Sequence, residues 1–197
     1  MDMLEKFRQA KQAEIQALKE LYEQGEFPEP FEGFRPSFEM ALRKGGRPAV
    51  IAEYKRASPS KGVINTAFTP EDVAGMYAGA GAAALSVLTE ETWFQGDLGY
   101  LERMAEPGLP LLRKDFILDK LQIAMTAATK ASALLLIARM CSSAQDLAEL
   151  QQAAMFHGLD AVVEVFDQAD LDMARQAKAR IIQVNNRDLD TLTTNLD

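Results

Sequence analysis

The sequence predicts an α/β protein that is built as a (β/α)8 TIM barrel, with about six βα units between residues 49 and 197. From residue 49 onward, short apolar runs alternate with amphipathic helical segments, as in parallel βαβ units that cover both faces of a sheet. Polar residues follow nearly every apolar run, which indicates that the C-terminal ends of several strands contribute side chains to one site. Such a shared site is typical of a barrel. The glycine-rich dinucleotide motif of an open doubly wound sheet is absent after the first run.

Residues 1–48 are predicted to form a helical extension that packs on the barrel. Residues 2–23 carry a narrow apolar stripe among Lys, Glu, Gln and Ala, and Gly25 and Pro28 follow it, as expected of an amphipathic helix and its end. A second, short helix is expected from Ser37 to Arg43.

The predicted barrel units, residues 49–197, form one domain. The expected strands are the apolar runs Ala49–Tyr54, Ala83–Val87, Pro110–Arg113, Ala133–Ala138, Ala161–Val165 and Ile181–Val184. The expected helices between them are Pro70–Ala80, Leu98–Ala105, Lys120–Thr129, Ser143–His157 and Gln168–Ala177. Thr69 before Pro70 and Ser143 before Asp146 are favourable helix starts.

The repeat length bears on how many units the chain holds. The strand starts at 49 and 181 are five repeats apart, so one repeat takes about 26 residues, and a whole barrel with its extension should need about 260. We therefore expect either that the native chain continues past Asp197 or that a partner closes the sheet. Left open, the edges of the first and sixth strands should promote self-association and leave the 197-residue chain weakly active.

Composition excludes several classes of function. A formal net charge of −8 argues against nucleic-acid binding, and the longest nearly apolar run is far too short for a membrane span. The first residues are charged throughout, so we expect no signal peptide. The single cysteine, Cys141, is consistent with a cytoplasmic protein without disulfides. The single histidine, His157, makes a histidine-rich metal site improbable, and we expect no metal or organic cofactor.

The stretch Pro48–Gly62 is predicted to end in a functional site. Alternation along a strand places Ile51, Glu53 and Lys55 on one face. Two neighbouring charged side chains at the end of an apolar strand form either an ion pair or a reaction site, because removing unpaired charges from water costs free energy. Taken alone, this stretch favours the ion pair.

Five motifs in order indicate a family. The chain carries E-x-K-R-A-S-P-S-K-G, S-V-L-T-E, R-K-D-F-I, V-E-V and N-N-R-D-L at successive strand ends. In their order and spacing these resemble indole-3-glycerol phosphate synthase, a lyase and decarboxylase of tryptophan biosynthesis, over essentially the whole chain. The resemblance implies a small anionic substrate with a phosphate and a carboxylate, whose ring closure, decarboxylation and dehydration give indole-3-glycerol phosphate.

The resemblance also implies roles for individual residues. Lys114 matches the general acid, Glu164 the catalytic carboxylate, and Lys55 with Glu53 a supporting pair. The residues that match substrate-orienting, ligand-contacting or pocket-wall positions are Asn185, Arg187, Ser58, Phe94 and Phe116.

Each role has a structural alternative. Lys114 could pair with neighbouring Asp115, Arg187 could pair with Asp188, and Phe94 and Phe116 are more often core than pocket. Glu164 lies in an apolar run, so we expect a cation beside it, either Lys114 or Lys55.

Two rival functions stay open. One is a non-catalytic truncated half-barrel that folds only with a partner or by self-association. The other is a different ribulose-phosphate barrel such as phosphoribosylanthranilate isomerase, which would need a cysteine and aspartate pair. Cys141 lacks a suitable acid beside it in the sequence.

Overall fold

The computed structural model describes residues 3–44, 48–64 and 66–186. The chain divides into two compact units. We call residues 31–115 and 126–134 the early-strand unit, and residues 1–30, 116–125 and 135–197 the late-strand unit. Each unit is described by itself below.

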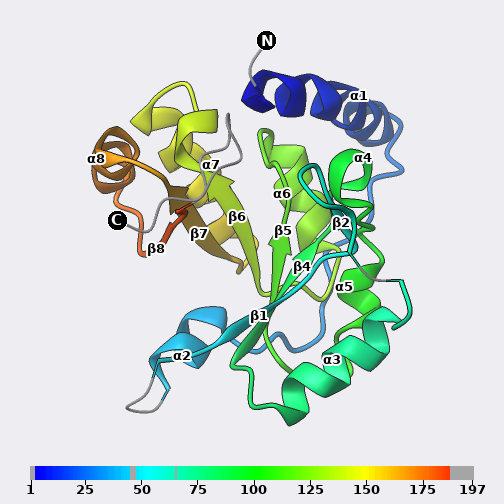
Figure 1. Cartoon of the computed structure of the whole chain (residues 1–197). Helices are drawn as coiled ribbons and strands as arrows, with labels where there is room; N and C mark the ends of the chain where they lie inside the picture. The colour runs from blue at the N-terminus through cyan, green and yellow to red at the C-terminus, as the bar shows by residue number, and fades with distance from the viewer. Residues whose placement is uncertain (1–2, 45–47, 65, 187–197) are drawn as a thin grey trace. The chain divides into compact units, whose positions relative to one another are not determined.

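The strands of the main sheet follow one another in chain order, β1-β4-β5-β6-β7-β8 (Figure 1). They are β1 (Ile51–Tyr54), β4 (Ala84–Leu88), β5 (Leu111–Lys114), β6 (Ala133–Ile137), β7 (Asp160–Val165) and β8 (Ile181–Val184). The β1–β4, β4–β5, β5–β6 and β7–β8 pairs are parallel. A doubly wound sheet reverses its strand order at a switch point, and this order has no reversal. The predicted α/β arrangement, six successive units of a barrel, is confirmed.

Helices occupy the predicted segments between these strands, and the short α4 (Glu91–Phe94) and 3₁₀-helix η1 (Ala138–Met140) were not predicted. The early-strand unit contains α2 (Phe38–Arg43), α3 (Pro70–Gly79), α4 and α5 (Tyr100–Arg103). The late-strand unit contains α1 (Met3–Glu23), η1, α7 (Ala144–Phe156) and α8 (Gln168–Gln176). Helix α6 (Lys120–Ala127) begins in the late-strand unit and ends in the early one.

Both predicted helix starts are confirmed by their caps. The Thr69 hydroxyl accepts a hydrogen bond from the Asp72 N–H, and the Asp72 carboxylate accepts one in return from the Thr69 N–H. This capping box satisfies two N–H groups that a helix start leaves without partners. The Ser143 hydroxyl accepts from the Asp146 N–H in the same way at α7.

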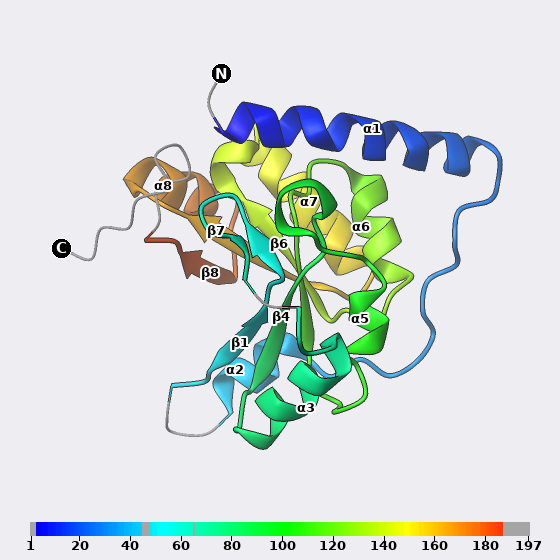
Figure 2. The ribbon, with the colours of Figure 1, turned by 45° about the vertical axis from the view of Figure 1, so that its right-hand side comes forward.

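The core of the early-strand unit lies between its strands and α3 and α5. Tyr54, Leu85 and Val87 project from β1 and β4 into a buried cluster with Tyr100 and Leu101 of α5. Figure 2 shows α3 beside β1 and β4. Because successive residues of a strand face opposite sides, this packing directs Glu53 and Ser86 to the other face of the sheet.

A small hairpin was missed by the sequence analysis. It is made of β2 (Ala57–Ser58) and β3 (Gly62–Val63), which pair antiparallel within the loop that follows β1. Gly62 has a φ of +62°, a left-handed conformation that glycine adopts without a steric cost. Strands of two residues are too short for an alternation pattern to reveal them.

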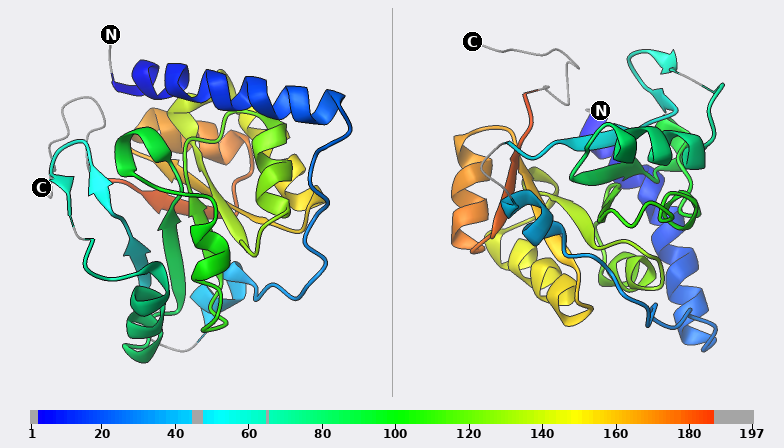
Figure 3. Two further views of the ribbon diagram at one scale, coloured as in Figure 1. Left: turned by 90° about the vertical axis from the view of Figure 1, so that its right-hand side faces the viewer. Right: turned by 90° about the horizontal axis from the view of Figure 1, so that it is seen from below.

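Helix α1 is held to α6 by polar contacts inside the late-strand unit (Figure 3). Gln122 of α6 is fully buried, and its amide group donates to the Glu14 carboxylate and the Phe116 carbonyl, both at 3.1 Å. Its carbonyl oxygen accepts from the N–H groups of Leu118 and Asp119. Glu14 also pairs at 2.6 Å with Lys11, which is itself only 5% exposed. One side chain thus joins α1 to the segment after β5.

Replacing Gln122 by methionine is expected to lower the free energy of unfolding by about 3 kcal/mol. Methionine fits the volume but leaves several buried donors and acceptors without partners, at about 1–3 kcal/mol for each group that water cannot reach. Urea denaturation measures the change.

The matched control for this change is Gln151→Met, since Gln151 makes one described hydrogen bond, at 2.9 Å to the Ala177 carbonyl. It should cost about 1 kcal/mol. Equal losses in the two variants would contradict the role of Gln122.

Across the described residues, no helix combines the length and the apolar character needed to cross a membrane.

Candidate functional site

Glu53 and Lys55 form the ion pair that the sequence favoured. The Lys55 ammonium lies 2.7 Å from the Glu53 carboxylate, and each side chain is about one third exposed. The Ser86 hydroxyl of the neighbouring strand lies 3.3 Å from the second Glu53 oxygen and donates to it. The Tyr77 hydroxyl donates to the Glu53 carbonyl from α3. Ser86 therefore orients the carboxylate and Tyr77 fixes the backbone of Glu53, so that the carboxylate holds Lys55 at the C-terminal end of β1.

Lys114 lies at the same end and on the same face. Tyr54 of β1 pairs with Val87 of β4, which pairs with Arg113 of β5. Lys55 follows Tyr54, and Lys114 follows Arg113. The two lysines therefore occupy equivalent positions at the ends of β1 and β5, which lie on either side of β4. Their backbones are then roughly 10 Å apart, since neighbouring strands are spaced about 4.8 Å. Two lysine side chains and one carboxylate thus share this face, an arrangement suited to an anionic ligand.

The segment after β4 is shaped by Glu90, which is 1% exposed. Its carboxylate accepts hydrogen bonds from the N–H groups of Thr92, Trp93 and Phe94 at 3.0, 2.7 and 3.2 Å. A carboxylate at a helix N-terminus satisfies donors that the helix cannot, so Glu90 fixes α4 and with it Phe94. The backbone at Gly96 passes close to Thr89. A Cβ at position 96 would lie 2.5 Å from the carbonyl carbon of Thr89, so this position requires glycine. Phe94 as a pocket wall stays a prediction.

Ser58 lies in the hairpin after β1 and is 6% exposed. Its hydroxyl oxygen accepts from the Lys61 N–H at 3.3 Å. This contact shapes the hairpin turn, and a ligand contact by Ser58 stays a prediction.

Glu164 of β7 is the buried carboxylate of the late-strand unit and is 3% exposed. One of its oxygens accepts from the Gln183 amide at 2.6 Å, and the other accepts from the Asn185 amide at 3.1 Å. The register pairs Glu164 with Gln183. These two amides orient the carboxylate oxygens, an arrangement suited to a base or an electrostatic stabiliser.

Gln183 was missed by the sequence analysis, although a signal for it exists. Residues 183 and 185 lie on one face of β8 by strand alternation. The parallel pairing of β8 with β7 then places both side chains beside Glu164. The cation expected near Glu164, Lys114 or Lys55, belongs to the early-strand unit and stays a prediction.

Phe116 and Arg187 are two further residues with predicted site roles. Phe116 is 7% exposed and stacks on Phe7 of α1, with ring centroids 4.1 Å apart. One face of this ring is thus used in packing, and its role as a pocket wall stays a prediction. Arg187 lies outside the described residues.

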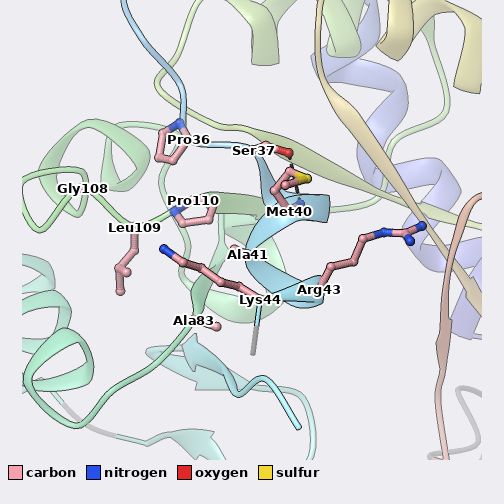
Figure 4. A pocket seen from close by; sticks show the side chains of 10 residues that line it. All are labelled: Pro36, Ser37, Met40, Ala41, Arg43, Lys44, Ala83, Gly108, Leu109 and Pro110. Atoms are coloured by element: carbon pink, nitrogen blue, oxygen red, sulfur yellow. Dashed lines mark hydrogen bonds between the residues drawn. The ribbon is translucent and has the colours of Figure 1, made fainter. Parts of the chain in front are cut away.

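A cavity of about 600 Å³ lies at the opposite end of the early strands (Figure 4). It lies between α2 and the residues just before β4 and β5, such as Ala83 and Pro110. The side chains of Arg43 and Lys44 extend from it in opposite directions. Functional groups of parallel barrels gather at the C-terminal strand ends, whereas the N-terminal end serves stability. We therefore place the functional face at Lys55 and Lys114.

Cys141 follows η1 and is unsuited to act as a base or a nucleophile near neutral pH. Burial, with a smaller contribution from the nearby Asp146 carboxylate, raises the pKa of its thiol to about 11. The thiolate is the reactive form of cysteine, so the native thiol is nearly inert at pH 7.

Iodoacetamide should therefore alkylate Cys141 at pH 8 about 100-fold more slowly in the native chain than in the urea-unfolded chain. The thiolate fraction at that pH is about 10⁻³ in the native state, against about 0.2 for an ordinary thiol. The native rate should rise about tenfold per pH unit up to pH 10. Mass spectrometry follows the reaction cleanly, because the chain has a single cysteine. Equal rates for both states at pH 8 would contradict the raised pKa.

Fold and side chains together define a class of protein. Its members have the α/β architecture of a (β/α)8 barrel. In this chain the early-strand unit carries Lys55 and Lys114 at its C-terminal strand ends, and the late-strand unit carries the buried carboxylate of Glu164 on β7.

Comparison with known proteins gives the family. The model of the family "Indole-3-glycerol phosphate synthase" matches residues 4–197. A protein of that name from Dehalococcoides mccartyi strain CBDB1 is 46% identical over 166 residues, which are 82% of this chain and 64% of the relative. Those from Polaromonas naphthalenivorans and Carboxydothermus hydrogenoformans are 46% and 47% identical, each over 77% of this chain and 58% of the relative.

The chain therefore belongs to the indole-3-glycerol phosphate synthase family. It spans about three fifths of the length of these curated relatives.

Proposed function

We propose that the protein acts as a lyase and decarboxylase in tryptophan biosynthesis. Its substrate is 1-(2-carboxyphenylamino)-1-deoxyribulose 5-phosphate, and its products are indole-3-glycerol phosphate, carbon dioxide and water. Family membership supports the reaction. The observation within the structure that carries it is the placement of Lys55 and Lys114 on one face at the C-terminal strand ends. A cytoplasmic location is proposed with it.

The reaction defines what the side chains must do. The ring carbon that bears the carboxylate attacks the sugar carbonyl carbon, and the carbonyl oxygen takes up a proton. Loss of carbon dioxide then restores the aromatic ring. The new hydroxyl finally takes up a second proton from the acid and leaves as water, while a base removes a proton from the neighbouring carbon. One acid, one base and cations for two anionic groups are sufficient.

We assign these tasks to the described side chains as follows. The Lys114 ammonium protonates the carbonyl oxygen, and the Glu164 carboxylate acts as the base that Gln183 and Asn185 orient. Lys55, oriented by Glu53, adds a second positive charge for the anionic substrate. Ser58, Phe94, Phe116 and Arg187 are proposed contacts to the substrate. The chemistry requires no metal or organic cofactor.

The direct test is to incubate the chain with this substrate and follow the fluorescence of the indole product, with release of carbon dioxide as a second measure. Production of both supports the proposal. Tight binding of a reduced, unreactive analogue without turnover would instead favour the non-catalytic half-barrel. Sizing by light scattering in the same buffer checks the expected self-association, for which the exposed Val184 of β8 is a candidate contact.

The isomerase alternative is not favoured. That reaction would use a cysteine and aspartate pair, and the raised pKa of the Cys141 thiol leaves too little thiolate to act as a base near neutral pH.

A further inference from the structure

Two charged residues flank Lys114 and point to the opposite face of β5. Arg113 and Asp115 form an ion pair at 2.9 Å, and their side chains are 3% and 1% exposed. Residues i−1 and i+1 of a strand share the face that residue i does not use. The pair therefore lies behind Lys114, on the helix side of the sheet. The carboxylate that the sequence offered as a partner for Lys114 is thus engaged on the other face.

Thr89 joins this pair to the end of β4. Its hydroxyl donates to the Asp115 carboxylate at 2.6 Å and accepts from Arg113 Nε at 3.2 Å. Its backbone N–H donates to the Lys114 carbonyl at 3.1 Å. Lys114 is therefore held twice by Thr89, directly through its own carbonyl group and indirectly through its neighbour's carboxylate.

The guanidinium of Arg113 also contacts α6. Its Nη1 donates to the Thr126 hydroxyl at 3.0 Å. Thr126 is fully buried and Thr89 is 3% exposed. One guanidinium thus contacts two buried threonine hydroxyls, one at the strand end beside Lys114 and one on a helix.

Stability alone gives a weak reason for this arrangement. Desolvating two charges costs several kcal/mol per ion, and well-packed apolar side chains of similar volume often serve stability as well or better. What the polar arrangement adds is direction, because each hydrogen bond fixes an angle as well as a distance.

We propose that Thr89, Asp115 and Arg113 are positioning residues that fix the end of β5 so that the Lys114 ammonium meets the substrate in the productive geometry. This inference rests on the proposed function of Lys114. It explains why the chain carries Thr89 in S-V-L-T-E, and Arg113 and Asp115 in R-K-D-F-I, although the reaction assigns them no chemistry.

The test compares two isosteric variants. Thr89→Val removes the hydroxyl next to Lys114, and Thr126→Val removes the hydroxyl that binds the same arginine on α6. Both changes are buried and should lower stability to a similar extent. Thr89→Val should lower kcat about tenfold with little change in KM, because misplacing a reacting group acts on the chemical step. Thr126→Val should keep kcat within about twofold. Thr89→Ser, which restores a hydroxyl, should recover most of the loss.

Hydrogen exchange at the amide of residue 89 gives a readout without turnover. This amide should exchange at least tenfold faster in Thr89→Val than in Thr126→Val if the strand end has loosened. Unchanged kcat in Thr89→Val, or equal losses of kcat in both valine variants, overturns the proposal when the unmodified chain turns over substrate. If the unmodified chain is inactive, the proposed function fails. Equal exchange rates of the residue 89 amide in the two valine variants overturn the positioning role, whether or not the chain is active.

Discussion

Replacing Lys114 by alanine is expected to lower the turnover number about 10²- to 10⁴-fold while the chain stays folded. The ammonium is assigned to the charge that develops on the carbonyl oxygen, and losing such an acid or electrostatic stabiliser typically costs a factor of this size. Lys114 is the last residue of β5 and only partly buried, so truncating it removes little core. Indole fluorescence at saturating substrate gives the turnover number, and thermal unfolding verifies the fold.

Lys130→Ala is the matched control for this change. Lys130 also lies in the early-strand unit and forms an ion pair with Glu102 at 2.6 Å, in which the side chains are 37% and 63% exposed. Exposed pairs contribute about 0–1 kcal/mol, so this variant should keep both stability and turnover. Turnover in Lys114→Ala at the level of Lys130→Ala would end the assignment of Lys114 as the acid.

Replacing Glu164 by glutamine should lower the turnover number about 10²-fold or more, because the side chain keeps its shape but loses its negative charge. A modest loss of stability accompanies the change. Glu164 accepts from the amides of Gln183 and Asn185, and a new amide group in its place would face one of them donor to donor. Leaving one buried donor unpaired costs about 1–3 kcal/mol.

Gln183→Met separates these two effects. It removes one of the amides that bind Glu164, so it should cause a similar loss of stability while it keeps the carboxylate. Its turnover should fall less than tenfold. Were Glu164 purely structural, Glu164→Gln and Gln183→Met would lose similar stability and both would retain their turnover numbers.

In the proposed reaction Lys114 and Glu164 act on the substrate directly, whereas the residues around them act indirectly. Glu90 fixes α4 through three backbone N–H groups, and Gln122 fixes the segment that carries Phe116. Side chains buried in this way build the frame that a reacting group needs, since a displacement of about 1 Å can cost two orders of magnitude in rate. The predicted effects above are largest where a side chain reacts and smaller where it only positions.

The sequence by itself determined the strands of the main sheet, the longer helices and the faces of the strands, but not the β2–β3 hairpin or α4. Alternation placed Glu53 and Lys55 together, and the structure pairs them at 2.7 Å. The Thr69 and Ser143 caps marked helix starts correctly. Each of these depends on residues within a few positions of one another, whose geometry the backbone period alone sets.

The tertiary structure alone decided which distant residues meet. The register of β7 and β8 brings Gln183 to Glu164, the β4–β5 register brings Thr89 to Asp115, and the packing of α1 brings Phe7 onto Phe116. Strand period says which face a side chain takes, but the partner opposite it depends on register and packing, which form only when segments far apart in the chain assemble. The partners that orient Glu164 and hold the strand end at Lys114 are therefore properties of the fold.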